Sequence, residues 1–118
     1  MKLQLQHVSV PMPADGHEHA RAFYGGVLGF DEVARPAGGR AGVWFAAGPV
    51  QVHLGVEEAF RAPARAHPGF RVRGLDALRA RLVAAGQAPV PAPDLDGARR
   101  FHAADPFGNR LEFLAETT

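Results

Sequence analysis

The sequence predicts an α+β protein in which two paired βαβββ modules form a curved, partly closed, barrel-like sheet around a metal or ligand cavity. Two observations lead to this prediction. The order strand, helix, three strands can be read twice along the 118 residues, and a charged segment containing Pro63 separates the two readings. We therefore expect a single domain made of modules at residues 1–56 and 67–118, joined by a linker at residues 57–66.

The first module begins with alternating side chains that predict a strand over residues 3–10, ended by the prolines that follow. Apolar side chains then recur at helical spacing over residues 17–28, and Gly29 is a natural C-cap for that helix. Three strands should follow, at residues 30–34, 42–46 and 50–56.

The second module repeats this order. A strand is expected over residues 67–73, and a helix with an apolar stripe from Leu75 to Ala85 should end at Gly86. Three short strands complete the repeat, at residues 88–90, 99–103 and 110–114.

A strong turn signal precedes the last strand. Pro106 presets the backbone for a turn, and Gly108 with Asn109 tolerates the left-handed conformation. Glu112 then follows within an otherwise apolar strand. If this carboxylate points inward it needs a partner, which a metal ion or a proton-transfer role would supply; the alternative is a solvated edge strand.

Four possible metal ligands occupy matching places in the two modules. His7 and His67 open the modules, while His53 and Glu112 lie 46 and 45 residues further on, each on the last strand of its module. A lone histidine on a strand face is commonly a hydrogen-bonded structural residue, but the repeat favours ligands. Imidazoles with one carboxylate suit zinc, iron, manganese or nickel, so the sequence predicts a divalent metal site if the two sheets close together.

Composition excludes several classes of protein. Thirteen basic and twelve acidic side chains are scattered along the chain, so no electrostatic case exists for binding nucleic acid. Without cysteine, disulfides, thiolate zinc sites and cysteine nucleophiles are excluded. No apolar run is long enough to cross a membrane, and we expect a soluble, cytoplasmic protein.

Several short motifs together resemble the vicinal oxygen chelate superfamily, which includes glyoxalase I, extradiol dioxygenases, fosfomycin-resistance proteins and bleomycin-resistance proteins. The matching motifs span essentially the whole chain. They are His7-Val-Ser-Val, Ala22-Phe-Tyr with Leu28-Gly-Phe, His67-Pro-Gly-Phe, and Asp105-Pro-Phe-Gly-Asn-Arg-Leu-Glu112. The resemblance implies paired βαβββ modules, a divalent metal held by His7, His67 and Glu112, and a homodimer.

Two positions depart from individual members of that superfamily. Glyoxalase I has glutamate or glutamine where this chain has His53, with Gln51 the nearest alternative inward residue. His102 falls where the fosfomycin-resistance relatives place an inward tyrosine. His102 is therefore expected to line the substrate pocket or to act as a proton donor; the alternative is an exposed strand histidine.

Three functions remain open at this level. The first is a metal-dependent lyase, isomerase or dioxygenase in which Glu112 or His102 moves a proton while the metal stabilises developing negative charge on a small oxygen-bearing substrate. The second is a metal-free, bleomycin-resistance-like binding protein for a small molecule. The third keeps the fold with neither activity. The predicted pocket residues are Gln51, Trp44, Phe101 and His102.

A homodimer is also expected from the sheets themselves. Two four-stranded sheets from so short a chain leave edges and apolar faces that one chain covers poorly. The residues that we expect between subunits are Phe45, Val50, Val52 and Phe60.

Overall fold

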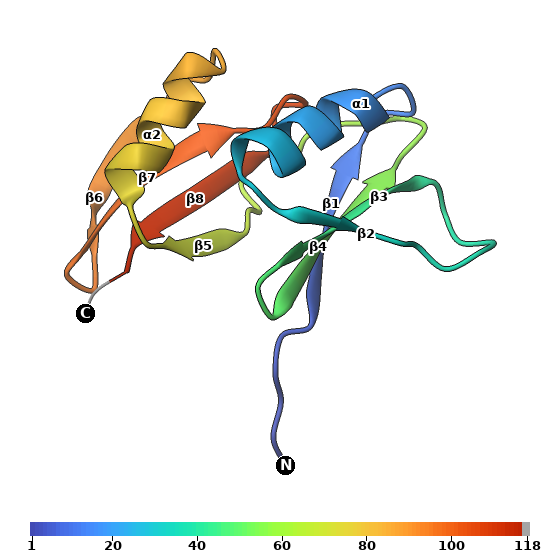
Figure 1. The fold of residues 1–118 in the computed structure, drawn as a ribbon, viewed down its shortest axis with the longest axis horizontal. Coiled ribbons are helices and arrows are strands. Elements are labelled where there is room, and N and C mark those ends of the chain that lie inside the picture. Colours follow the sequence, from blue (N-terminus) through green and yellow to red (C-terminus); the bar gives the residue numbers. More distant parts are fainter. Residues whose placement is uncertain (117–118) are drawn as a thin grey trace. The chain divides into compact units, whose positions relative to one another are not determined.

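The computed structural model describes residues 1–116 and confirms the predicted α+β class, with two four-stranded sheets and few helices (Figure 1). The chain forms two compact units, residues 1–62 and 63–118, and the division falls inside the predicted linker. No helix in the described residues is long and apolar enough to span a membrane.

The first module contains six elements in the predicted order. They are β1 (His7–Met12), α1 (His17–Ala20), η1 (Arg21–Val27), β2 (Asp31–Val33), β3 (Gly42–Ala47) and β4 (Val50–Val56). Its sheet has the order β1-β4-β3-β2; β1 runs parallel to β4, and the other pairs are antiparallel.

The second module repeats this topology with one helix. Its elements are β5 (Gly69–Val72), α2 (Leu75–Ala84), β6 (Val90–Leu95), β7 (Ala98–Ala104) and β8 (Arg110–Ala115). The sheet order is β5-β8-β7-β6, with β5 parallel to β8 and the remaining pairs antiparallel. The predicted βαβββ repeat is therefore confirmed.

Each module has its own hydrophobic core on one face of its sheet. In the first, Tyr24 of η1 stacks on Phe45 of β3 with ring centroids 5.6 Å apart, and both side chains are buried. In the second, Phe113 of β8 lies between Phe70 and Phe101, at 5.7 and 5.6 Å. Strand alternation places the polar site residues on the opposite face.

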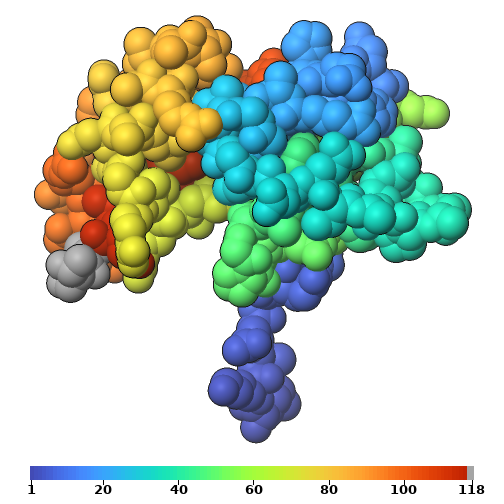
Figure 2. Space-filling view, in the orientation of Figure 1, coloured from blue at the N-terminus to red at the C-terminus, as the bar shows by residue number. Residues whose placement is uncertain are grey.

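Strand β1 differs from the prediction at both ends. It begins at His7 rather than Leu3, because β4 begins only at Val50 and gives the first residues no partner strand. Residues 1–6 extend from the module as an arm (Figure 2). At the other end β1 continues through Pro11, which an edge strand tolerates because one row of its backbone groups needs no partner.

Further elements depart from the sequence prediction, and β5 begins only at Gly69, so His67 lies just before the strand rather than on it. The predicted helix at residues 17–28 becomes a π-helix from Arg21, with the amide of Leu28 donating to the carbonyl of Phe23. Gly25 and Gly26 are weak α-helix formers within that turn. Strand β6, predicted near residues 88–90, lies at Val90–Leu95 as an irregular edge strand that accommodates two prolines.

The structure also corrects the residues predicted for the dimer interface. Phe45 and Val52 are 1% and 0% exposed, because both face the hydrophobic core of the first module. They are therefore unavailable for contact with another subunit. Val50 and Phe60 are partly exposed.

Candidate metal centre

The turn from Asp105 to Asn109 fixes the register that builds the site. The carboxylate of Asp105 accepts hydrogen bonds from the backbone amides of Phe107 and Asn109 and from the side-chain amide of Asn109, all at 2.8–2.9 Å. This turn joins β7 to β8 so that His102 lies opposite Glu112 in the antiparallel pair. The turn predicted from sequence therefore sets which side chains meet across the strands.

Three donor atoms converge on the polar face of the second module. Glu112 Oε1 lies 2.9 Å from Nε2 of His67 and 3.2 Å from Nε2 of His102. The ligand atoms of these three residues all lie within 4.8 Å of one another. Two imidazoles and a carboxylate are a donor set that zinc, iron, manganese and nickel accept, so the group can hold a divalent cation.

The hydrogen bonding of His67 determines what can lie between its ring and Glu112. Its Nδ1 lies 2.7 Å from the carbonyl oxygen of Arg65, which only accepts hydrogen bonds, so Nδ1 carries the proton. In the neutral ring Nε2 then presents a lone pair to the carboxylate oxygen of Glu112. Either a proton or a metal cation must lie between these two acceptors, and a backbone carbonyl on Nδ1 is the usual outer partner of a histidine ligand.

Glu112 is buried, with 8% of its side chain exposed. Burial raises the pKa of this carboxyl, but in the metal-free protein hydrogen bonding with His67, His102 and Arg100 outweighs burial, so the net pKa is lowered from its ordinary value. The ionised form that a metal requires is therefore the favoured form.

Arg100 is a site residue that the sequence analysis missed. Its Nη1 donates to Glu112 Oε2 at 3.2 Å, and its Nε donates to the carbonyl oxygen of Pro93 at 2.6 Å. One carboxylate oxygen is thus held by the arginine while the other faces the two histidines. Strand alternation could have found it, because Arg100 is two residues from His102 on β7 and shares its face.

The corresponding positions of the first module form a stacked cluster instead. The ring of His53 stacks on Trp44 with centroids 3.6 Å apart and on His7 at 4.3 Å. Nε2 of His53 lies 2.8 Å from the side-chain oxygen of Gln51. Burial, with a smaller effect of His7, lowers the pKa of His53, so its neutral form is favoured.

Strand register shows that these clusters are equivalent. Ser9, two residues after His7, pairs with His53; Gly69, two residues after His67, pairs with Glu112. Across the antiparallel pairs, Trp44 lies opposite His53 as His102 lies opposite Glu112.

The structure therefore groups the predicted residues as follows. His67, Glu112 and His102 come together in the second module, and His7, His53, Trp44 and Gln51 lie together in the first. Convergence of all four predicted ligands on one ion stays a prediction. His102, predicted as a pocket or proton-donor residue, is also a candidate ligand.

Phe101 is a correction to the predicted pocket. Its side chain is 4% exposed and packs against Phe113 in the core, on the opposite face of β7 from His102. A ligand on the Glu112 face would therefore not contact this ring.

Comparisons with known proteins support the fold and the family. The sequence profile of the Glyoxalase/Bleomycin resistance protein/Dioxygenase superfamily matches residues 4–113. A crystal structure of a protein assigned to the glyoxalase family from Bacillus anthracis is 36% identical, with a TM-score of 0.91 over 99% of this chain and 98% of the other. No curated protein matched the sequence.

Two further solved structures share the fold at lower identity. Lactoylglutathione lyase from Agrobacterium tumefaciens is 22% identical, with a TM-score of 0.75 over 97% of this chain and 94% of the other. The fosfomycin resistance protein FosX from Listeria monocytogenes is 16% identical, with a TM-score of 0.79 over 99% and 96%. At these identities the likeness concerns the fold alone.

Proposed function

The chain belongs to the Glyoxalase/Bleomycin resistance protein/Dioxygenase superfamily, and from this membership we propose that it is a divalent-metal-dependent enzyme acting on a small oxygen-bearing substrate. The reaction would be of the lyase, isomerase or dioxygenase type. The observation that supports this proposal is the convergence of His67 Nε2, His102 Nε2 and Glu112 Oε1.

The three side chains fit a metal for chemical reasons. The carboxylate supplies negative charge, the carbonyl of Arg65 directs the lone pair of His67 inward, and Arg100 holds the second oxygen of Glu112. A bound divalent ion would polarise substrate oxygens and stabilise negative charge that develops on them. Glu112 or His102 would then be placed to accept or donate a proton beside the substrate.

Metal content tests the proposal directly. Protein purified without chelator should carry close to one divalent ion per chain by elemental analysis, and the double change His67→Ala with Glu112→Ala should abolish retention because two of three donors are lost. His19→Ala, an exposed histidine of α1, is the matched control and should retain metal. Circular dichroism checks that each variant is folded.

Stoichiometry near zero after reconstitution with zinc, iron, manganese and nickel would contradict the proposal and favour the metal-free binding protein. His102→Ala separates two roles of that residue: a ligand lost from the site lowers metal retention, whereas a lost proton donor leaves metal in place and lowers turnover. The change His7→Ala with His53→Ala tests the four-ligand prediction, since loss of metal would show that the first-module histidines contribute.

We further propose that the protein is a homodimer. Strands β1 and β2 are the edges of the first sheet, and β5 and β6 are those of the second. Unpaired sheet edges favour association with another copy. Exposed apolar side chains on residues 1–6 add to this tendency.

A further inference from the structure

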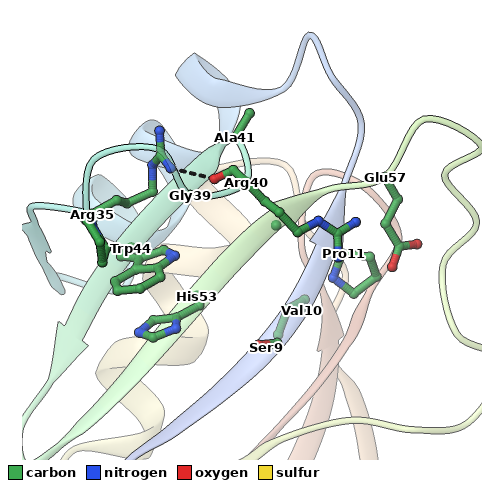
Figure 3. Close-up of a pocket in the computed structure, with 12 residues that line it drawn as sticks. Ser9, Val10, Pro11, Arg35, Gly39, Arg40, Ala41, Trp44, His53 and Glu57 are labelled. Atoms are coloured by element: carbon green, nitrogen blue, oxygen red, sulfur yellow. Dashed lines mark hydrogen bonds between the residues drawn. The ribbon is translucent and has the colours of Figure 1, made fainter.

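The first module carries a pocket of about 350 Å³ that contains none of the second-module residues (Figure 3). It lies on the sheet face that presents Trp44 and His53, opposite the face that packs into the hydrophobic core. Strands β1, β3 and β4 contribute to it, together with residues 35–36 and 39–41 of the segment between β2 and β3. Its volume lies within the usual range of small-molecule sites, roughly 300–1,000 Å³.

The indole ring of Trp44 lines one side of the pocket. Figure 3 shows this ring lying over the imidazole of His53, and the two planes differ by 3°. Further apolar lining comes from Pro11, Pro36 and Ala41. Such a surface favours a ligand with a flat apolar body.

Two guanidinium groups give the pocket a positive character. Arg35 donates from Nη1 to the carbonyl oxygen of Arg40, and Arg40 donates from Nη2 to the carbonyl oxygen of Val56 at 3.3 Å. Each guanidinium has five N–H donors, so these contacts hold the groups in place and leave other donors for a ligand. Glu57, whose carboxylate also lines the pocket, is the one acidic side chain among its lining residues.

Arg35 and Arg40 differ from Arg21 of the same module in their ion pairs with carboxylates. Arg21 forms ion pairs with Glu18 and Glu32, at 2.7 and 2.9 Å. Within residues 1–116, no carboxylate lies within 4.0 Å of the guanidinium nitrogens of Arg35 or Arg40. Their charge is therefore available to an anion from solution.

We infer that this pocket binds a small organic acid, with its anionic group at Arg35 and Arg40 and its flat apolar body against the indole ring of Trp44. The planar guanidinium matches the paired oxygens of an acid group and discriminates against neutral analogues. Because Trp44 and His53 are also predicted residues of the substrate pocket and metal site, the inference rests on the proposed function. Metal content tests that function and acid binding in chelator tests the inference, so the two failures can be told apart.

Trp44 provides the measurement, because it is the only tryptophan of the chain. Titration of the full-length protein with benzoate, in chelator and at low salt, should give a saturable change in tryptophan fluorescence, with calorimetry as a second readout. Benzamide, the neutral analogue of the same shape, should bind at least about tenfold more weakly, the scale of a lost charged hydrogen bond. Comparing phenylphosphonate with benzoate shows whether the pocket prefers a tetrahedral phosphonate or a planar carboxylate.

Variants test the residues themselves. Arg35→Gln and Arg40→Gln should each weaken benzoate or phenylphosphonate binding about fivefold to tenfold, whereas Arg79→Gln on α2 should leave it unchanged. Glu57→Gln should strengthen binding about twofold to threefold, because one repulsive charge is removed at an exposed, screened position. The inference is overturned if neither acid binds by either method, if benzamide binds equally well, or if both arginine variants bind like the parent.

Discussion

Glu112 shows at the scale of a single residue how a buried charge is kept ionised. One oxygen faces two imidazoles and the other accepts from Arg100, so hydrogen bonds outweigh the unfavourable burial of the carboxylate. The same balance makes the stability of the metal-free protein depend on pH.

The pKa of Glu112 is lower in the folded protein than its ordinary value of 4.5, so the unfolded chain binds this proton more readily. The stabilisation is present above pH 4.5 and is lost as the pH falls from there through the folded pKa. We expect the difference in free energy of unfolding between wild type and Glu112→Gln, measured by urea denaturation with chelator, to shrink over that window. A difference that stays constant from pH 6 to pH 3 would show that the charge adds no stability.

At the scale of the element, Gly42 determines how closely β3 approaches β4. A Cβ atom at this position would lie 1.9 Å from the carbonyl oxygen of Leu54, and a backbone atom cannot rotate away. Gly42→Ala should therefore lower the free energy of unfolding by about 3 kcal/mol, the upper end for an overpacked interior position.

Gly26→Ala is the matched control, because a Cβ there meets nothing within 4 Å. It should be neutral or stabilising by up to about 1 kcal/mol, since alanine restricts the unfolded chain. Chemical denaturation of both variants measures the contrast, and equal midpoints would show that β3 moves to relieve the contact.

Element order could be predicted because local patterns determine it here. Alternating side chains define β4, and the Asp105–Asn109 turn defines the start of β8. The π-helix could not be predicted, since the spacing of its apolar residues is the same as in an α-helix. The beginning of β1 depends on where its partner strand begins, which is a tertiary property.

Part of the candidate site could also be predicted from local sequence patterns. His67 and Glu112 follow from the repeat, but the partner role of Arg100 requires the exact register of β7 with β8. Phe101 was misplaced because the face of β7 was not assigned before its neighbours were known. Each paired residue of β7 lies as many positions before Phe107 as its partner on β8 lies after it. The register of the two strands could therefore have been predicted from the position of the turn.

At the scale of the whole molecule, the arm before β1 is the feature that most needs a partner. Leu3 and Leu5 are 85% and 70% exposed. We expect sedimentation to show a dimer in the micromolar range, and Leu3→Ser with Leu5→Ser to shift it towards monomer because apolar contact area is lost.

Val83→Ser is the control for this experiment. Val83 is also exposed, at 50%, but lies on α2 of the second module. This change should leave the dimer intact. A monomeric parent protein throughout the range, or a double variant that stays fully dimeric, would contradict the assignment of the arm to subunit contact.

The two modules share the same strand pairing and register, so they have equivalent backbones that carry different side chains at matching positions. Trp44 and His53 stand where the second module has His102 and Glu112, and His7 stands where it has His67. Two substitutions, Trp44→His and His53→Glu, would therefore copy the complete donor set into the first module without moving any strand.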